Sequence, residues 1–132
     1  MIKLELPLKV ILPRKRTADR VWNVNLNVYR NTHHQILNDV KQIYKGLVAG
    51  ILSVDHPPLS GPHEFKYTLF PSTKRNVDVM NPCSIIDKFT CDALVELGMF
   101  SDDNHKIVKR LTFEFGEVDK ANPRCELEII PL

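Results

Sequence analysis

Residues 81–98 constrain the fold most, because they carry both the start and the stop signal of a helix. Asn81 is a good N-cap residue, and Pro82 at the first helical position loses only an N–H that would have had no partner. Gly98 suits the position that ends a helix. The apolar residues between them recur at helical spacing: Ile85, Ile86, Phe89, Ala93, Leu94 and Leu97. The sequence therefore predicts an amphipathic helix over residues 82–97, with one face in the core.

A second helix is predicted to follow Asn31 and Thr32, which can cap it, and to run as far as Ile51. Apolar residues recur there at steps of three and four: Ile36, Leu37, Val40, Ile43, Tyr44, Leu47, Val48 and Ile51. Gly46 and Gly50 lie four residues apart in this helix. We expect them to permit close packing against a strand or a second subunit, at some cost in helix stability.

Four segments alternate between apolar and polar residues in the manner of strands: residues 2–12, 64–70, 107–116 and 124–130. Pro7 should mark a bend or an edge position in the first of them. Trp22 and Tyr29 flank a short alternating segment, and we expect both rings to pack in the core or at its rim. The order of elements predicts an α+β domain, a mixed sheet of about four strands with two long helices packed on one face. Residues 1–132 should form a single domain.

Composition excludes several classes of protein. The 43% hydrophobic fraction is typical of an ordered globular chain. No run of about 18 apolar residues is present and the N-terminus lacks a signal-peptide pattern, so we expect no membrane partner. The 3 cysteines have no metal-binding spacing and are expected to be reduced thiols of a cytoplasmic protein.

The charge is unevenly distributed along the chain. Residues 1–76 hold 12 Lys and Arg against 5 Asp and Glu, whereas residues 77–132 hold 6 against 11. This asymmetry is typical of a protein that holds a polyanion on one part and a metal on another, although charges also drift by chance in short chains. The candidate DNA-binding residues lie in two basic turns: Arg14, Lys15, Arg16 and Arg20 in the first, and Lys74 and Arg75 in the second. Solvated basic turns are the alternative interpretation.

Carboxylates flank the helix of residues 82–97. Asp78 precedes it, Asp102 and Asp103 follow it, and Lys88 lies within it. The helix is roughly 25 Å long at about 1.5 Å per residue, so the chain after Gly98 must fold back for these groups to converge. If they do, the group suits Mg²⁺ or Mn²⁺, with the lysine facing a phosphate. The alternative is that the Asp pair lies in a solvated turn.

The same segment resembles the signature of the RusA family of Holliday junction resolvases, small phage- and prophage-encoded endonucleases. The resemblance covers about a fifth of the chain. The residues that carry it are Lys74, Arg75, Asp78, Asn81, Lys88, the run Asp92-Ala93-Leu94, Gly98, Asp102 and Asp103. Many family members have Asp-x-Asp-Asn where this chain has Asp78-Val79-Met80-Asn81, so a second carboxylate is missing at Met80.

The resemblance implies a Mg²⁺-dependent endonuclease that acts as a homodimer and nicks two opposed strands of a four-way DNA junction symmetrically. It implies a bacterial host cytoplasm, with a phage or prophage origin. Asp78, Lys88 and Asp103 are the implied catalytic residues, and Asp78 and Asp103 the first metal ligands. Asp87 and Asp102 are candidates for a third ligand, while Asp92 is interpreted as structural. Two alternatives remain open: a metal-dependent nuclease for other branched DNA, and a non-catalytic DNA-binding phage accessory protein on the same fold.

Overall fold

Four segments with alternating apolar residues form one sheet in the computed structural model, which describes residues 1–52 and 56–132. The strands are β1 (Ile2–Leu6), β4 (His63–Phe70), β5 (Val108–Phe115) and β6 (Arg124–Pro131). Their order across the sheet is β1-β6-β4-β5. β4 and β5 run parallel, whereas β6 is antiparallel to both β1 and β4. The sheet is therefore mixed, as the sequence predicts.

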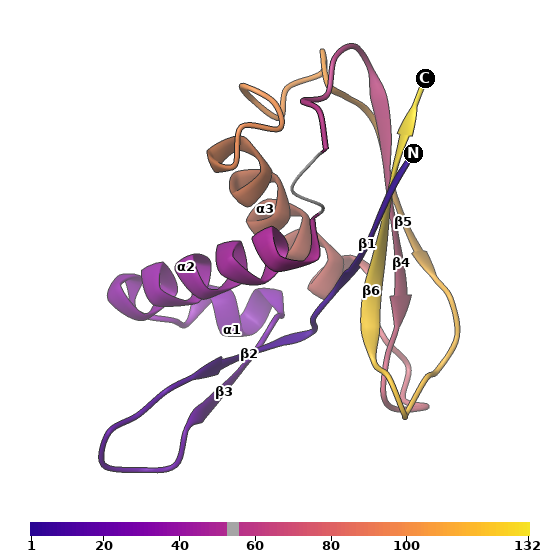
Figure 1. Ribbon diagram of the computed structural model, residues 1–132. Coiled ribbons are helices and arrows are strands. Elements are labelled where there is room, and N and C mark those ends of the chain that lie inside the picture. Colours follow the sequence, from indigo (N-terminus) through magenta and orange to yellow (C-terminus); the bar gives the residue numbers. More distant parts are fainter. Residues whose placement is uncertain (53–55) are drawn as a thin grey trace.

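The two long helices, α2 (His34–Ile51) and α3 (Met80–Glu96), lie on the same side of this sheet (Figure 1). Every second residue of β1, β4 and β6 is buried, since period-2 alternation directs one set of side chains toward the helices. The buried set from the sheet includes Leu4, Phe65, Tyr67, Leu127 and Ile129. This arrangement confirms the predicted α+β class with helices on one face.

The first predicted strand, residues 2–12, is in fact two strands. Pro7 separates β1 from β2 (Lys9–Leu12), and β2 pairs with β3 (Arg20–Asn23) instead of continuing in the main sheet. This antiparallel hairpin extends away from the body of the molecule (Figure 1). The bend at proline was predicted, but the hairpin was not, because β3 is only four residues long and its inward residues are not all apolar.

A short helix, α1 (Leu26–Arg30), follows the hairpin where the sequence suggests continued alternation. Asn25 accepts a hydrogen bond from the N–H of Val28 at 3.1 Å and so caps α1. The aromatic residues pack as predicted: Trp22, Tyr29 and Tyr44 all lie with ring centroids 5.6–6.1 Å from Phe89 of α3. This cluster joins the hairpin, α1 and α2 to α3.

Two predicted helix caps are wrong. α3 begins at Met80, after Val79, so Asn81 lies inside the first turn, and its Oδ1 accepts a hydrogen bond from the N–H of Leu26 at 2.9 Å. Pro82 still lies in the first turn, where its missing N–H is tolerated. His33, not the Asn31-Thr32 pair, caps α2, with its Nδ1 accepting from the N–H of Gln35.

The glycines of α2 do not mediate close packing within the chain. An added Cβ at Gly46 or Gly50 would meet no atom within 4 Å. The neighbouring Leu47 and Ile51 are each 40% exposed, so this face of α2 is open to solvent. Packing against a strand of the same chain, as the sequence suggests, is therefore wrong, and packing against a second subunit stays a prediction.

The three cysteines, Cys83, Cys91 and Cys125, are buried and form no disulfide. This agrees with the interpretation of the three as free thiols. None of the helices within residues 1–52 and 56–132 is long and apolar enough to cross a membrane.

Candidate functional site

The chain reverses direction immediately after α3. Gly98 adopts a positive φ of 79°, a conformation that side chains with a Cβ disfavour, and Met99 donates its N–H to the carbonyl of Leu94 at 2.9 Å. Met99 and Phe100 are buried. The rings of Phe100 and Phe65 of β4 pack edge to face, with their centroids 6.0 Å apart. These apolar anchors hold the following residues beside α3, as the fold-back expectation requires.

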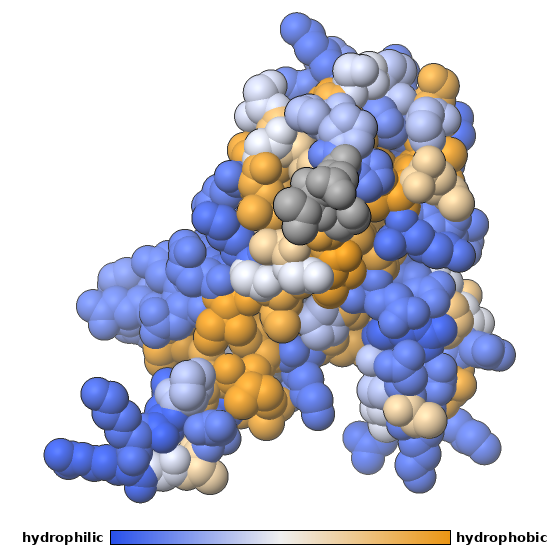
Figure 2. Space-filling model, viewed as in Figure 1, coloured by the Kyte–Doolittle hydropathy of each residue, from blue (hydrophilic) through white to orange (hydrophobic). Residues whose placement is uncertain are grey.

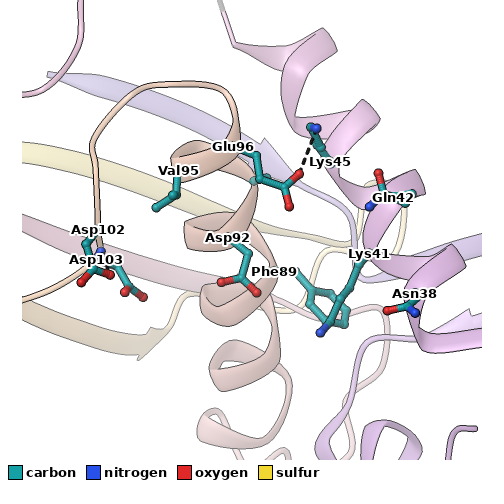
Figure 3. A pocket seen from close by; sticks show the side chains of 11 residues that line it. Asn38, Lys41, Gln42, Lys45, Phe89, Asp92, Val95, Glu96, Asp102 and Asp103 are labelled. Atoms are coloured by element: carbon teal, nitrogen blue, oxygen red, sulfur yellow. Dashed lines mark hydrogen bonds and ion pairs between the residues drawn. The ribbon is translucent and has the colours of Figure 1, made fainter. Parts of the chain in front are cut away.

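Asp102 and Asp103 lie in this returning segment, beside the middle of α3 (Figure 3). Asp102 accepts a hydrogen bond from the N–H of Asp103 at 2.9 Å through its Oδ1. Partial burial raises the pKa of Asp103, and the hydrogen bond and charge of Asp102 raise it further. Asp92 of α3 adds to this shift, so the returning segment brings one carboxylate close to the helix.

Asp87 is the most buried carboxylate of the region. Its Oδ1 accepts hydrogen bonds from the hydroxyl of Tyr67 at 2.7 Å and from the Sγ of Cys91 at 3.3 Å. Burial raises the pKa of Asp87, and the charges of Asp103 and Asp92 raise it further, while the two hydrogen bonds oppose the shift. Both hydrogen bonds use Oδ1, so the structure fixes the orientation of this carboxylate through one oxygen.

Asp87, Asp92, Asp102 and Asp103 form what we term the acidic cluster. Three of the four were predicted as site residues, whereas Asp92 was interpreted as structural. Within the described part of the chain, no three His, Cys, Asp or Glu side chains are close enough together to form a metal centre. Asp92, Asp102 and Asp103 nevertheless line one cavity between α2 and α3, and carboxylates suit Mg²⁺, which keeps several waters and needs only one or two protein ligands. The donor chemistry therefore fits Mg²⁺ bound by two carboxylates.

A cavity of about 410 Å³ lies between α2 and α3 at the acidic cluster. Asp92, Asp102 and Asp103 contribute carboxylates to its wall, and Lys41 and Lys45 of α2 contribute ammonium groups (Figure 3). Lys45 forms an ion pair with Glu96 at 2.9 Å across the gap. Neither lysine is among the site residues predicted from the sequence, although their spacing of four residues on the polar side of α2 is a usable signal.

Asp78 lies apart from the acidic cluster. Its Oδ1 accepts a hydrogen bond from the N–H of Met80 at 3.2 Å, so it holds the start of α3. It lines a different cavity, of about 330 Å³, together with Asn76, Asn81 and the end of β4. Asp87 is seven residues into α3, roughly 10 Å along the axis from its start. The chain therefore brings Asp103 into one cavity with Asp92, whereas Asp78 lines the other cavity.

Lys88 is exposed on α3, next to Asp87 in sequence. The alternative role for it, an ion pair with Asp92 one turn later, is not formed: among the described residues, no carboxylate lies within 4 Å of its Nζ. Its ammonium group is therefore available to an anion.

The predicted DNA-binding residues are all exposed, and they fall in two turns. Arg14, Lys15 and Arg16 occupy the tip of the β2–β3 hairpin, which Figure 2 shows as a hydrophilic projection, and Arg20 begins β3 opposite Leu12. Asp19 accepts a hydrogen bond from the N–H of Arg14 at 3.1 Å, which shapes the loop. Lys74 and Arg75 lie in the turn that joins β4 to α3.

Comparison of the sequence with models of known protein families found no match, and comparison with curated proteins found none either.

Proposed function

We propose that this protein is a Mg²⁺-dependent endonuclease that resolves four-way DNA junctions by paired, symmetric nicking, acting as a homodimer. The observation that carries the proposal is the fold-back after Gly98, which puts Asp102 and Asp103 in one cavity with Asp92 of α3 and adds negative charge near Asp87. It coincides with the segment on which the resemblance to the RusA family rests. Mn²⁺ is an alternative ion with similar oxygen ligands.

Asp103 and Asp87 are the residues proposed to hold the metal, with Asp102 as a further candidate. Tyr67 orients Asp87 by donating to Oδ1, so that Oδ2 would be the oxygen that holds an ion, in the manner of hydrogen bonds that orient metal ligands. When bound, the ion would supply a water of lowered pKa and would stabilise charge on the phosphate. Asp78 was expected as a ligand of the same ion. Its separate cavity and its hydrogen bond to the N–H of Met80 support a different role in the single chain, in the turn that leads into α3.

Lys88 is proposed to face the phosphate that is cut. Its exposed ammonium lies one residue from Asp87 and has no carboxylate partner within the described residues. A cation at this point stabilises negative charge that develops on the phosphoryl oxygens or on the leaving oxygen. Lys41, in the wall of the cavity that Asp92, Asp102 and Asp103 line, is a second candidate for phosphate contact.

The basic hairpin is proposed to bind the DNA backbone. A two-stranded ribbon fits a DNA groove, and its tip carries Arg14, Lys15 and Arg16 without a carboxylate within ion-pair distance among the described residues. Backbone contacts from such residues position the protein without reading sequence. This suits recognition of a branched shape.

Two alternatives are kept. The position of Met80, 64% exposed at the start of α3 where a second Asp is expected, favours a non-catalytic DNA-binding protein of this fold. A metal-dependent nuclease for other branched DNA would use the same residues on a different substrate. Both alternatives give distinct outcomes in one cleavage experiment.

The experiment is cleavage of a labelled mobile four-way junction in Mg²⁺ and in EDTA, with wild type, Asp103→Asn and Asp87→Asn, and linear duplex as control. Paired nicks that require Mg²⁺ and vanish in Asp103→Asn are expected. Junction binding without cutting in Mg²⁺ or Mn²⁺ would support the non-catalytic alternative. Equal cutting of flaps or linear duplex would support the other nuclease.

A further inference from the structure

The edge of the sheet at β5 is open. β5 is the end strand in the order β1-β6-β4-β5, and it pairs only with β4 among the strands of the described chain. It is eight residues long, and an exposed edge of this length is a template for pairing with another strand. Leu111 and Phe115 on this strand are 47% and 49% exposed. The edge thus combines unpaired backbone groups with apolar side chains.

The backbone groups that face the open edge can be assigned from the ladder to β4. Gly116 donates its N–H to the carbonyl of Leu69 at 2.9 Å, so the even-numbered residues of the strand's second half bond to β4. Backbone direction alternates along a strand, and therefore Leu111, Phe113 and Phe115 present their N–H and C=O groups to the open edge.

We propose that β5 pairs antiparallel with β5 of a second copy, about a two-fold axis at Thr112, and so joins two sheets into one of eight strands. A two-fold axis perpendicular to the sheet keeps the helices of both copies on one side. It also requires directly opposite residues to share a face, which limits the register to steps of two residues.

Charge selects one register among these. With Thr112 at the axis, Arg110 of each copy lies opposite Glu114 of the other, twice by symmetry, on the face away from the helices. The pairs are of the non-hydrogen-bonded type, in which opposite Cα atoms approach to about 4.5 Å. Within each copy Arg110 lies 3.8 Å from Glu64, and Glu114 lies 3.2 Å from Lys66, so the charges would alternate across the joined sheet.

A shift of the register by two residues in either direction removes these pairs. It places Arg110 opposite Thr112 or Gly116 of the other copy, and each Glu114 then lacks a cation across the interface. On the face toward the helices, the selected register sets Leu111 opposite Phe113 of the other copy. Each exposed Leu111 would then be covered by Phe113 of the other copy, while each Phe115 would lie opposite the aliphatic stem of Lys109.

The other edge of the sheet is the rival interface. β1 also carries opposite charges two residues apart, at Lys3 and Glu5, and could pair with itself in the same manner. However, its inward residues Ile2, Leu4 and Leu6 are already buried to 7% exposure or less, so pairing there would cover little further apolar surface. β5 is favoured because only its edge gains apolar burial.

The pairing would place the two acidic clusters on one side of the joined sheet. Val108, which follows the returning segment, is four residues from Thr112 and so about 13 Å from the axis. The two segments with Asp103 would then lie at opposite ends of the paired strands. This consequence for cutting opposed DNA strands rests on the proposed function, whereas the pairing itself is argued from β5 alone.

The test is the molar mass of the 15.2 kDa chain by sedimentation equilibrium, with circular dichroism to verify that each variant is folded. Wild type is expected at twice the chain mass. Arg110→Glu and Glu114→Arg each place like charges opposite one another twice, so each should weaken the dimer by about 30-fold or more. An equimolar mixture of the two variants restores both opposite-charge pairs and should recover the dimer.

The control is Lys3→Glu, the same reversal of charge at the other edge, which should leave the mass unchanged. Three results would overturn the proposal: single variants as dimeric as wild type, a mixture that stays monomeric, or dissociation by Lys3→Glu. Because mass is measured without DNA, a stable dimer that fails to cut junctions would refute the proposed function and leave this interface intact.

Discussion

Replacement of Tyr67 by Phe tests the network that holds Asp87. The hydroxyl of Tyr67 donates to Asp87 Oδ1 at 2.7 Å, in a site where the ring is fully buried and the carboxylate is largely so. Hydrogen bonds to charged groups stabilise proteins by about 1.5–3 kcal/mol. Unfolding entropy of about 2.1 cal/mol/K per residue gives a chain of this length roughly 0.28 kcal/mol/K, so Tm should fall by about 5–11 °C at pH 8.

The loss should depend on pH. The hydrogen bond lowers the pKa of Asp87 against the larger effect of burial, so removing it raises the folded-state pKa further above the ordinary value. The loss of folding stability relative to wild type is therefore largest at pH 8, where Asp87 is charged. It is smaller near pH 4, where protonation removes the charge. Thermal unfolding followed by circular dichroism at both pH values measures this difference.

Tyr44→Phe is the matched control. Tyr44 is as buried as Tyr67, but its hydroxyl donates to the neutral carbonyl of Pro7 at 3.4 Å. Removal of the Tyr44 hydroxyl should lower the free energy of unfolding by less, about 1 kcal/mol. This loss should not change between pH 4 and 8. If Tyr67→Phe shows the same pH-independent cost as Tyr44→Phe, the inference that Tyr67 stabilises a charged Asp87 is wrong.

Three further predictions follow from the same structure. Gly46→Ala should stabilise the chain by about 0.5–1 kcal/mol in urea unfolding, because the added methyl meets no atom within 4 Å in a helix interior; a destabilised variant would show that this face is covered. Asp87→Asn should gain stability over wild type as the pH rises, because the raised pKa of Asp87 means that ionisation costs the folded state stability; parallel pH profiles would contradict this. Replacement of Arg14, Lys15 and Arg16 by Ala should weaken DNA binding and reduce the salt slope by about 0.9 per lost phosphate contact, and Lys120→Ala should not; equal effects would exclude a role for the hairpin.

Local signals in the sequence were sufficient for the main sheet and the long helices. Pro82 and Gly98 mark the two ends of α3 to within three residues, the alternation of β4 and β6 is regular, and β5 alternates between polar and apolar residues from Arg110 to Phe115. The hairpin was missed because residues 8–12 continue the alternation of β1 across Pro7. Nothing in that short segment indicates that its partner will be β3 and not the main sheet.

The site depends on contacts that local patterns do not encode. Gly98 and the apolar pair Met99-Phe100 predict that the chain reverses after α3. They do not predict how far along α3 the returning segment extends. It brings Asp103 into the cavity that Asp92 lines, whereas Asp78 lines a different cavity, so the predicted partnership of Asp103 with Asp78 stays a prediction. The bond from Tyr67 to Asp87 joins two elements that meet only in the folded core.

Asp103 is proposed to belong to a Mg²⁺-dependent site that cuts two strands of a junction together. A supercoiled plasmid that extrudes a cruciform, incubated with wild type or Asp103→Asn in Mg²⁺, distinguishes such a site from uncoordinated nicking. Coordinated nicks by a dimer convert the plasmid to linear DNA in one binding event, and the mutant should leave it supercoiled. Plasmid that stays supercoiled with wild type, or linear product made equally well by Asp103→Asn, would contradict the account.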